Sequence, residues 1–304
     1  QWNIQSNNYS HIFTKNFKTF SYGAASFSTN NKIDLDQSDD IVKKAMTLYQ
    51  LSGQMLRMGK YQSALDNCEK ALEMMKEKFG NTHLMIATLY DQTGSIHRLV
   101  GHHDKALDYH LKALEISKNL GEEQFQGDIY NNLGLVYESM GNYPQALECA
   151  ETSIELRKKH YGVESVQVAI SYNNLGQLYR KRSKYNESLK AYEKSIETFQ
   201  KVVGEQDPRI GTVYDNLGTL YTTLERYNDA LNYHKKALDI LLKYMGERNF
   251  TVAMVYSNLG YTNAQLGKYD EALKHHEKSL EIRKSLFGEE HPNVAQNYND
   301  IGII

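Results

Sequence analysis

A tyrosine followed four residues later by a glycine recurs along most of this chain at a nearly constant spacing. Successive copies lie 40 or 42 residues apart, and the pairs are Tyr90 and Gly94, Tyr130 and Gly134, Tyr172 and Gly176, Tyr214 and Gly218, Tyr256 and Gly260, Tyr298 and Gly302. Self-similarity at a fixed period of this length is typical of stacked structural repeats, each of which packs on its neighbours. The spacing therefore predicts one repeat array.

Two small residues follow each of the first five glycines, 12 and 19 residues later: Ala106 and Ala113, Ala146 and Ser153, Ser188 and Ser195, Ala230 and Ala237, Ala272 and Ser279. A bulky and a small residue four apart share one face of a first helix, and two small residues seven apart share one face of a second helix. The small residues permit close helix approach, and the tyrosines fill the space between neighbouring pairs. The pattern predicts an all-α fold of helix pairs.

The turn between the two helices of a pair also recurs, as Gly-Asn-Tyr at 141–143, Ser-Lys-Tyr at 183–185 and Gly-Lys-Tyr at 267–269. Glycine permits a tight turn, and the tyrosine is expected to pack back onto the pair. Pro144 follows this turn and suits the first turn of a helix, where its missing N–H costs nothing.

The triplet Asn-Leu-Gly at 132–134, 174–176, 216–218 and 258–260, together with this turn and the small pairs, resembles the tetratricopeptide repeat over residues 45–304. The resemblance implies a right-handed superhelical solenoid of helix pairs with a roughly 42-residue period and a concave groove that binds protein partners. Repeats are expected at about 45–78, 87–120, 127–160, 169–202, 211–244 and 253–286, with a partial repeat at 295–304.

The connector Phe-Gly-Glu-Glu-His-Pro-Asn-Val-Ala at 287–295 resembles that of the kinesin light chain subfamily of these repeats. Residues 1–44 show no sustained heptad pattern of the kind by which kinesin light chains pair with their heavy chain. The resemblance therefore implies the repeat fold and its groove, and the motor role is not carried over from it.

Polar residues recur just after the repeated tyrosines, and the resemblance places them in the groove: Asn131, Asn132, Asn173, Asn174, Asp215, Asn216, Ser257 and Asn258. An asparagine amide both donates and accepts, so a series of them suits the backbone of an extended ligand. The alternative is that each asparagine ties its helix to the neighbouring pair. Arg98, Arg180 and Lys181 fall near the ends of the same helices and favour an acidic partner segment carrying an aromatic residue, as kinesin light chain cargo peptides do; the alternative is a solvated charged rim.

Composition argues against several other functions. The 35 Lys and Arg and 37 Asp and Glu give a formal net charge of -2, so no basic field favours nucleic acid. No apolar run reaches the roughly 18 to 20 residues of a membrane span. Cys68 and Cys149 lie too far apart to suggest a zinc knuckle or a disulfide framework. We expect neither a nucleic-acid partner nor a membrane span.

Neither catalysis nor cofactor binding is indicated. No phosphate-binding glycine loop, Gly-x-Ser-x-Gly or His-Glu-x-x-His motif occurs. His110, His234 and His276 recur at one position of the second helix, which indicates packing rather than metal ligation. The sequence predicts no enzyme activity, no cofactor and no metal.

Residues 1–37 differ from the array in composition, because no acidic residue precedes Asp34 while Lys15, Lys18 and Lys32 lie among Ser, Asn and Phe. An acid-poor, Ser-rich segment is typical of a mitochondrial transit peptide, which favours an organelle address or its residual arm; an Asn-rich low-complexity tail on a cytoplasmic protein is the alternative. Residues 38–304 form the predicted array, which stops inside a repeat at Ile304, so further repeats or a capping helix are expected beyond it.

Two functions are compatible with these features. The first is a non-enzymatic adaptor whose groove binds an extended segment of a partner protein. The second is a structural accessory subunit of a larger, mitochondrial assembly of several subunits, with the groove empty or filled by a fixed neighbour.

Overall fold

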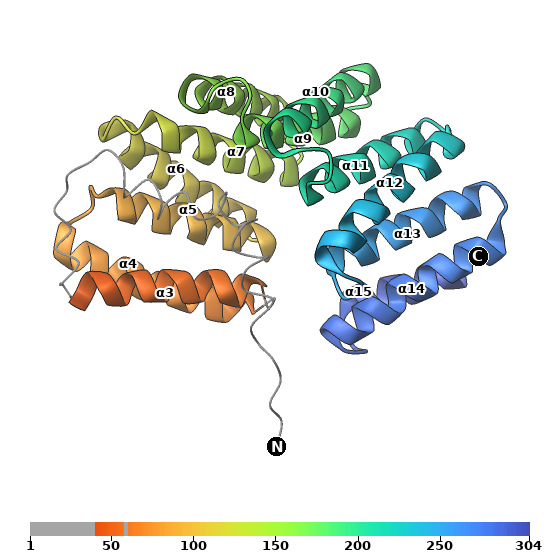
Figure 1. The fold of residues 1–304 in the computed structure, drawn as a ribbon. Coiled ribbons are helices and arrows are strands. Elements are labelled where there is room, and N and C mark those ends of the chain that lie inside the picture. Colours follow the sequence, from red (N-terminus) through yellow and green to blue (C-terminus); the bar gives the residue numbers. More distant parts are fainter. Residues whose placement is uncertain (1–39, 58–59) are drawn as a thin grey trace. The chain divides into compact units, whose positions relative to one another are not determined.

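The computed structural model describes residues 40–57 and 60–304, so the predicted targeting segment at 1–37 lies outside the described residues. The described residues form helices and no strand (Figure 1). The helices are α3 (Asp40–Arg57), α4 (Tyr61–Phe79), α5 (Leu84–Leu99), α6 (His103–Asn119), α7 (Glu123–Ser139), α8 (Tyr143–Tyr161), α9 (Val166–Lys181), α10 (Tyr185–Val203), α11 (Pro208–Thr223), α12 (Tyr227–Met245), α13 (Phe250–Gln265), α14 (Tyr269–Phe287) and α15 (Pro292–Gly302). The predicted all-α fold is confirmed.

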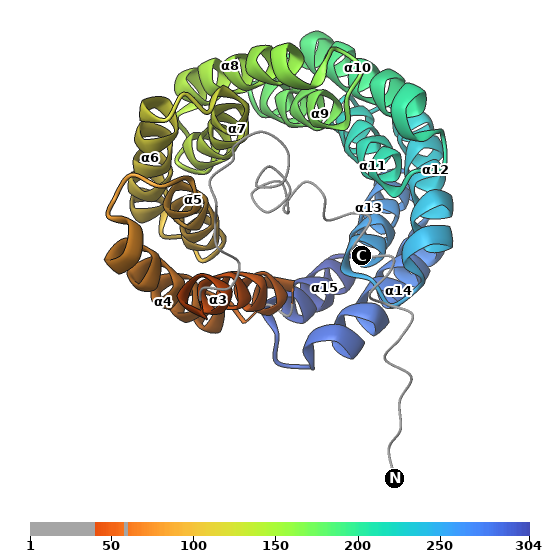
Figure 2. The ribbon, with the colours of Figure 1, turned by 60° about the vertical axis from the view of Figure 1, so that its left-hand side comes forward.

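The helices belong to two compact units, Gln1–Gly162 and Val163–Ile304. In each unit an odd-numbered first helix packs against the even-numbered second helix that follows it, and each pair packs on the next. Within a unit the first helices lie side by side in one layer and the second helices in another (Figure 2). α15 is a first helix at the end of the second unit.

The turns inside the pairs have the predicted conformation. Gly141 adopts φ 74°, and the non-glycine residues at the same turn position, Ser183 and Glu225, adopt φ 56° and 58°. An L-residue other than glycine meets a steric penalty at positive φ, so these two turns carry local strain. Pro144 lies in the first turn of α8, as expected.

The small residues of the second helices are fully buried, and where they are serines they also form hydrogen bonds. The hydroxyls of Ser153, Ser195 and Ser279 donate to backbone carbonyls of the first helix, on Gly127, Ala169 and Ala253, over 2.7 to 2.8 Å. A buried hydroxyl needs such a partner. Serine therefore replaces alanine without leaving an unpaired polar group.

The repeated glycines of the first helices are needed because a ring lies directly over them. A Cβ atom at Gly94, Gly218 or Gly260 would lie within 3 Å of the ring of His110, His234 or His276, respectively, and Tyr192 covers Gly176 in the same way. These rings are at most 3% exposed. The prediction that these histidines serve packing is confirmed.

Candidate functional site on the first helices

Asp215 on α11 connects two neighbouring helix pairs of the second unit. Its Oδ1 lies 2.6 Å from His234 Nδ1 on the partner helix α12. The side-chain amide of Asn258, on the next first helix α13, donates to both carboxylate oxygens over 3.1 and 3.0 Å. Only 10% of the Asp215 side chain and 1% of the His234 side chain are exposed. One buried carboxylate therefore joins three helices.

The same arrangement occurs in the first unit around Asp91 on α5. Its Oδ1 lies 2.7 Å from His110 Nδ1 on α6, and the Asn132 amide on α7 donates to both oxygens over 3.1 and 3.0 Å. Hydrogen bonds to an ionised acceptor are stronger than neutral ones. Among the described residues, each unit thus contains one Asp, His and Asn triad, which we call an aspartate bridge.

Two further junctions are joined by neutral groups. Asn216 on α11 donates its amide to Asn173 Oδ1 on α9 over 2.9 Å. Gln92, which occupies the asparagine position on α5, donates to the Ser52 hydroxyl on α3 over 3.1 Å. The amide nitrogens of Asn132, Asn216 and Asn258 are thus all bonded to a neighbouring first helix, as the alternative explanation of the asparagines requires.

The remaining predicted polar residues lie in the same layer. Asn131 on α7 and Asn174 on α9 are half-buried, and the Asn131 amide lies 3.4 Å from Asn132 Oδ1. The Ser257 hydroxyl contacts Ser279 Oγ at 2.8 Å and accepts from Arg283 over 3.3 Å. The structure therefore brings the predicted residues onto first helices, where they contact protein groups.

The predicted basic residues are divided between the units. Arg98 is half-buried on α5, and burial lowers the pKa of its guanidinium although Glu138 opposes the shift. Arg180 is half-buried at the end of α9, and the adjacent Lys181 is exposed. A guanidinium stays protonated despite such a shift, so Arg98 remains cationic.

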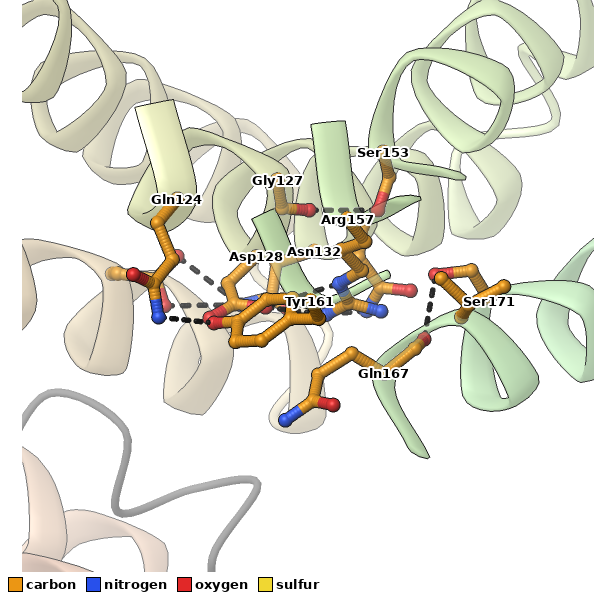
Figure 3. A network of polar contacts seen from close by, with 12 residues as sticks. Gln124, Gly127, Asp128, Asn132, Ser153, Arg157, Tyr161, Gln167 and Ser171 are labelled. Carbon is orange, nitrogen blue, oxygen red and sulfur yellow. Dashed lines mark hydrogen bonds and ion pairs between the residues drawn. The ribbon is translucent and has the colours of Figure 1, made fainter. Parts of the chain in front are cut away.

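A network around Asp128 on α7 was not predicted from the sequence (Figure 3). Arg157 on α8 donates to Asp128 Oδ1 from Nη2 over 2.7 Å and from Nε over 3.1 Å. Burial raises the pKa of Asp128, and the opposite charge of Arg157 counters that shift. The Gln124 amide donates to the Tyr161 hydroxyl over 2.9 Å at the other side of the network. The network fixes α7 against α8.

The aspartate bridges were also missed, although the chain contains a signal for them. We call the position two residues after each repeated tyrosine, where most repeats have asparagine, the ladder position. The residue before it is Asp only at 91 and 215, and the ring that covers the repeated glycine is then His110 or His234. At Ser257 the ring residue is again a histidine, His276, but its Nδ1 has no hydrogen-bond partner. Comparing the repeats with one another identifies the Asp and His pairs.

Reactive groups are scarce in the part of the chain that the structure describes. Burial raises the pKa of the Cys68 and Cys149 thiols to about 11, so both are protonated at neutral pH. The described residues contain no cluster of His, Cys, Asp and Glu suited to a metal ion. Nor does any described helix combine the length and apolarity that a membrane crossing needs.

Comparison with curated proteins finds outer dynein arm-docking complex subunit 4 of Homo sapiens, 31% identical over 100 residues. The Bos taurus protein of the same name matches equally, and in both cases the match covers 33% of this chain and 15% of the relative. The chain therefore matches less than a sixth of these relatives.

Among solved structures, a Rap protein complexed with competence and sporulation factor has a TM-score of 0.66 and 19% identity, covering 91% of this chain and 73% of that one. BtubC from P. vanneervenii has a TM-score of 0.58 and 21% identity, covering 84% and 95%. These likenesses show the fold. A family model described as the tetratricopeptide repeat matches residues 43–119, 125–196, 167–243 and 251–304. These matches cover most of the chain and coincide with its stacked helix pairs, and the chain belongs to the tetratricopeptide repeat family.

Proposed function

We propose that this chain is a non-enzymatic scaffold or adaptor that binds an extended segment of a partner protein along its first helices, in the groove that the family resemblance implies. The observation that supports this proposal is the fixed orientation of the half-buried amides of Asn132, Asn216 and Asn258. Their neighbours hold them before any ligand arrives, so binding would cost little side-chain ordering.

The chemistry of the neighbours determines which atom each amide offers. An ionised carboxylate only accepts, so Asn132 and Asn258 turn Nδ2 toward Asp91 and Asp215 and direct the carbonyl Oδ1 elsewhere. At Asn173 the pattern is reversed, because its Oδ1 accepts from Asn216. A peptide backbone presents one N–H and one C=O per residue, and such a mixed series of acceptors and donors suits it.

Arg180 and Lys181 on α9 support the further proposal that part of the partner segment is acidic, with an aromatic residue beside the acid. Charge reversal at both positions should slow association and reduce its salt dependence, because long-range attraction acts mainly on the association rate. Unchanged association kinetics would exclude an acidic contact at this end of α9.

The central experiment uses the natural partner, identified by purifying the chain from its native source. The double variant Asn216→Ala with Asn258→Ala should bind at least about tenfold more weakly, because each lost hydrogen bond contributes about 0.5 to 1.5 kcal/mol. Asn232→Ala, on the exposed face of α12, is the matched control and should bind normally. Circular dichroism monitors the fold. If the double variant unfolds, the asparagines have a structural role. If it stays folded and binds normally, the partner is recognised by other residues.

A second candidate function is a structural accessory subunit of a larger assembly. The observation that favours it is that the same asparagine amides bind neighbouring first helices. The curated relatives are named as subunits of a docking complex, which agrees with a role in an assembly. Native-source purification tests this candidate too, since it predicts fixed subunits that co-purify even when the asparagines are substituted.

The compartment is a separate proposal. If residues 1–37 are a mitochondrial address, this segment should direct a fused fluorescent protein to mitochondria. A diffuse cytoplasmic signal would favour a low-complexity tail.

A further inference from the structure

Besides Phe250 at its start, helix α13 exposes two large apolar side chains, which lie on either side of Asn258. Met254 is 41% exposed and Tyr261 is 55% exposed. Positions 254, 258 and 261 are four and three residues apart, so the three side chains share one helix face. The helix packs through other residues, because Val252, Val255 and Leu259 are at most 1% exposed. We call Met254, Asn258 and Tyr261 the α13 stripe.

The exposure of the α13 stripe is unusual among the complete helix pairs of the second unit. The equivalent positions on α11 are Thr212 and Thr219, and those on α9 are Ile170 and Gln177, all half-buried. The fold therefore does not require two large apolar side chains at these positions. Apolar groups left in water beside oriented polar groups indicate a contact surface.

The charges around the α13 stripe favour a basic neighbour. Helix α13 has no charged side chain, and the ladder position on α15 is Asp300 in place of an asparagine. Asp300 accepts from Gln296, one turn earlier on its own helix, over 2.7 Å. The buried Arg283 lies behind Ser257 and interacts electrostatically with Asp300, so it offsets part of that charge from inside the protein.

The neighbouring histidines do not neutralise the carboxylate of Asp300. Burial lowers the pKa of His276, which is therefore neutral at neutral pH. His234 lies against Asp215 and is covered by the helices, whereas Asp300 is half-buried and reachable. A ligand that approaches the α13 stripe thus meets Asp300 as its accessible charge.

Resting on the proposed function, we propose that the α13 stripe docks a large apolar side chain of the extended partner segment, beside a Lys or Arg that contacts Asp300. Asn258, held by Asp215, turns its carbonyl oxygen to the main-chain N–H of the docked residue. Arg180 and Lys181 lie on α9, at the other end of the second unit, so an acidic part of the same segment is compatible with this arrangement.

The size of the α13 stripe argues for a peptide anchor rather than a second copy of the chain. Two side chains of this kind bury at most a few hundred Å². A stable protein interface buries about 1,600 Å² in total. A single apolar anchor with flanking main-chain and charge contacts matches the smaller area.

The test uses three fluorescein-labelled peptides of equal length in a Ser-rich background, which differ at two central positions: Phe-Lys, Ser-Lys and Phe-Glu. Fluorescence anisotropy with the full chain should show the Phe-Lys peptide binding at least about tenfold more tightly than Ser-Lys, since burial of the ring provides the difference. It should bind about threefold more tightly than Phe-Glu, as expected of an exposed ion pair.

Three variants locate the contact. Met254→Ser with Tyr261→Ser should weaken Phe-Lys binding about tenfold, and Tyr269→Ser, equally exposed at 55% but on α14, should leave it unchanged. Asp300→Asn should abolish the preference for Lys over Glu while retaining the preference for Phe over Ser. Because these side chains are exposed or half-buried, all variants should keep the wild-type circular dichroism spectrum.

Several outcomes would overturn the proposal. If the Met254 and Tyr261 substitutions leave the affinity for the Phe-Lys peptide unchanged, the α13 stripe is not the docking site. If Tyr269→Ser loses as much affinity as the double variant, the peptide adsorbs non-specifically. A preference for Phe-Glu refutes the role of Asp300. Self-association that disappears in Tyr261→Ser assigns the α13 stripe to a second copy. If the asparagine variants weaken the natural partner and the stripe variants do not, the proposed function stands and this inference fails; if neither does, both fail.

Discussion

Substituting Asp215 by alanine should cost the fold far more than removing an ordinary surface carboxylate. The change deletes the acceptor of His234 Nδ1 at 2.6 Å and of two contacts from the Asn258 amide at 3.1 and 3.0 Å. Hydrogen bonds to a charged group contribute about 1.5 to 3 kcal/mol, and a buried donor left without a partner adds a desolvation cost of about 1 to 3 kcal/mol. Since these contributions overlap, we expect a loss of about 3 kcal/mol in the free energy of unfolding.

The assay is urea unfolding followed by far-ultraviolet circular dichroism. Asp239→Ala, an exposed carboxylate on α12, is the matched control and should stay within about 0.5 kcal/mol of the parent chain. Adding His234→Phe to Asp215→Ala should cost less than the sum of the two single changes, because the unpaired ring nitrogen is then gone. An Asp215→Ala chain as stable as Asp239→Ala would refute the bridge as a stabilising contact.

Gly218→Ala should destabilise by about 1 to 3 kcal/mol, because its Cβ would lie 2.7 Å from the His234 ring. The control Gly53→Ala on α3 should stabilise, because no atom lies within 4 Å of the added Cβ. Equal effects of the two variants in thermal unfolding would disprove the ring contact. Burial lowers the pKa of His276, so the unfolded chain binds a proton more readily, and stability should fall as pH drops below about 6.5. His276→Phe should reduce this acid loss, measured as the thermal midpoint against pH, and an unchanged pH profile would contradict it. Glu225→Gly should stabilise by about 1 kcal/mol, because Glu225 adopts φ 58°, a backbone conformation in which only glycine avoids a steric penalty. A loss of stability in urea unfolding would show that the Glu225 side chain contributes more than its backbone strain costs.

The sequence was sufficient to predict the helix pairs because their determinants are local and repeated. Tyr214 and Gly218 lie one turn apart on a single helix, and Ala230 and Ala237 lie two turns apart on the next, so spacing alone identifies the contacting faces. The histidine at 234 also recurred at one position, and its burial over Gly218 follows from that register.

The partners of the asparagines could not be predicted because they depend on contacts between helices far apart in sequence. Asn258 and Asp215 are 43 residues apart, and whether the amide reaches a carboxylate or faces a ligand is determined by how the pairs pack. The same holds for Asp128 and Arg157. Arg283 repeats the Arg157 position, but no other repeat has an acidic residue at the position of Asp128. Packing directions, rather than spacing, determine these contacts.

The aspartate bridges also make the junctions between helix pairs unequal, with consequences for cooperativity. In the second unit a charge-assisted bridge joins Asp215 to Asn258, whereas at the preceding junction the hydrogen bond between Asn173 and Asn216 is neutral and acts beside the shared apolar core. In a linear array, nearest-neighbour coupling decides which repeats open together. The α11–α14 block should therefore exchange its amide hydrogens as one slow foldon. Helices α9 and α10 should open independently of that block, at a lower free energy of opening. A partner could then remodel one end of the unit while the other end remains intact.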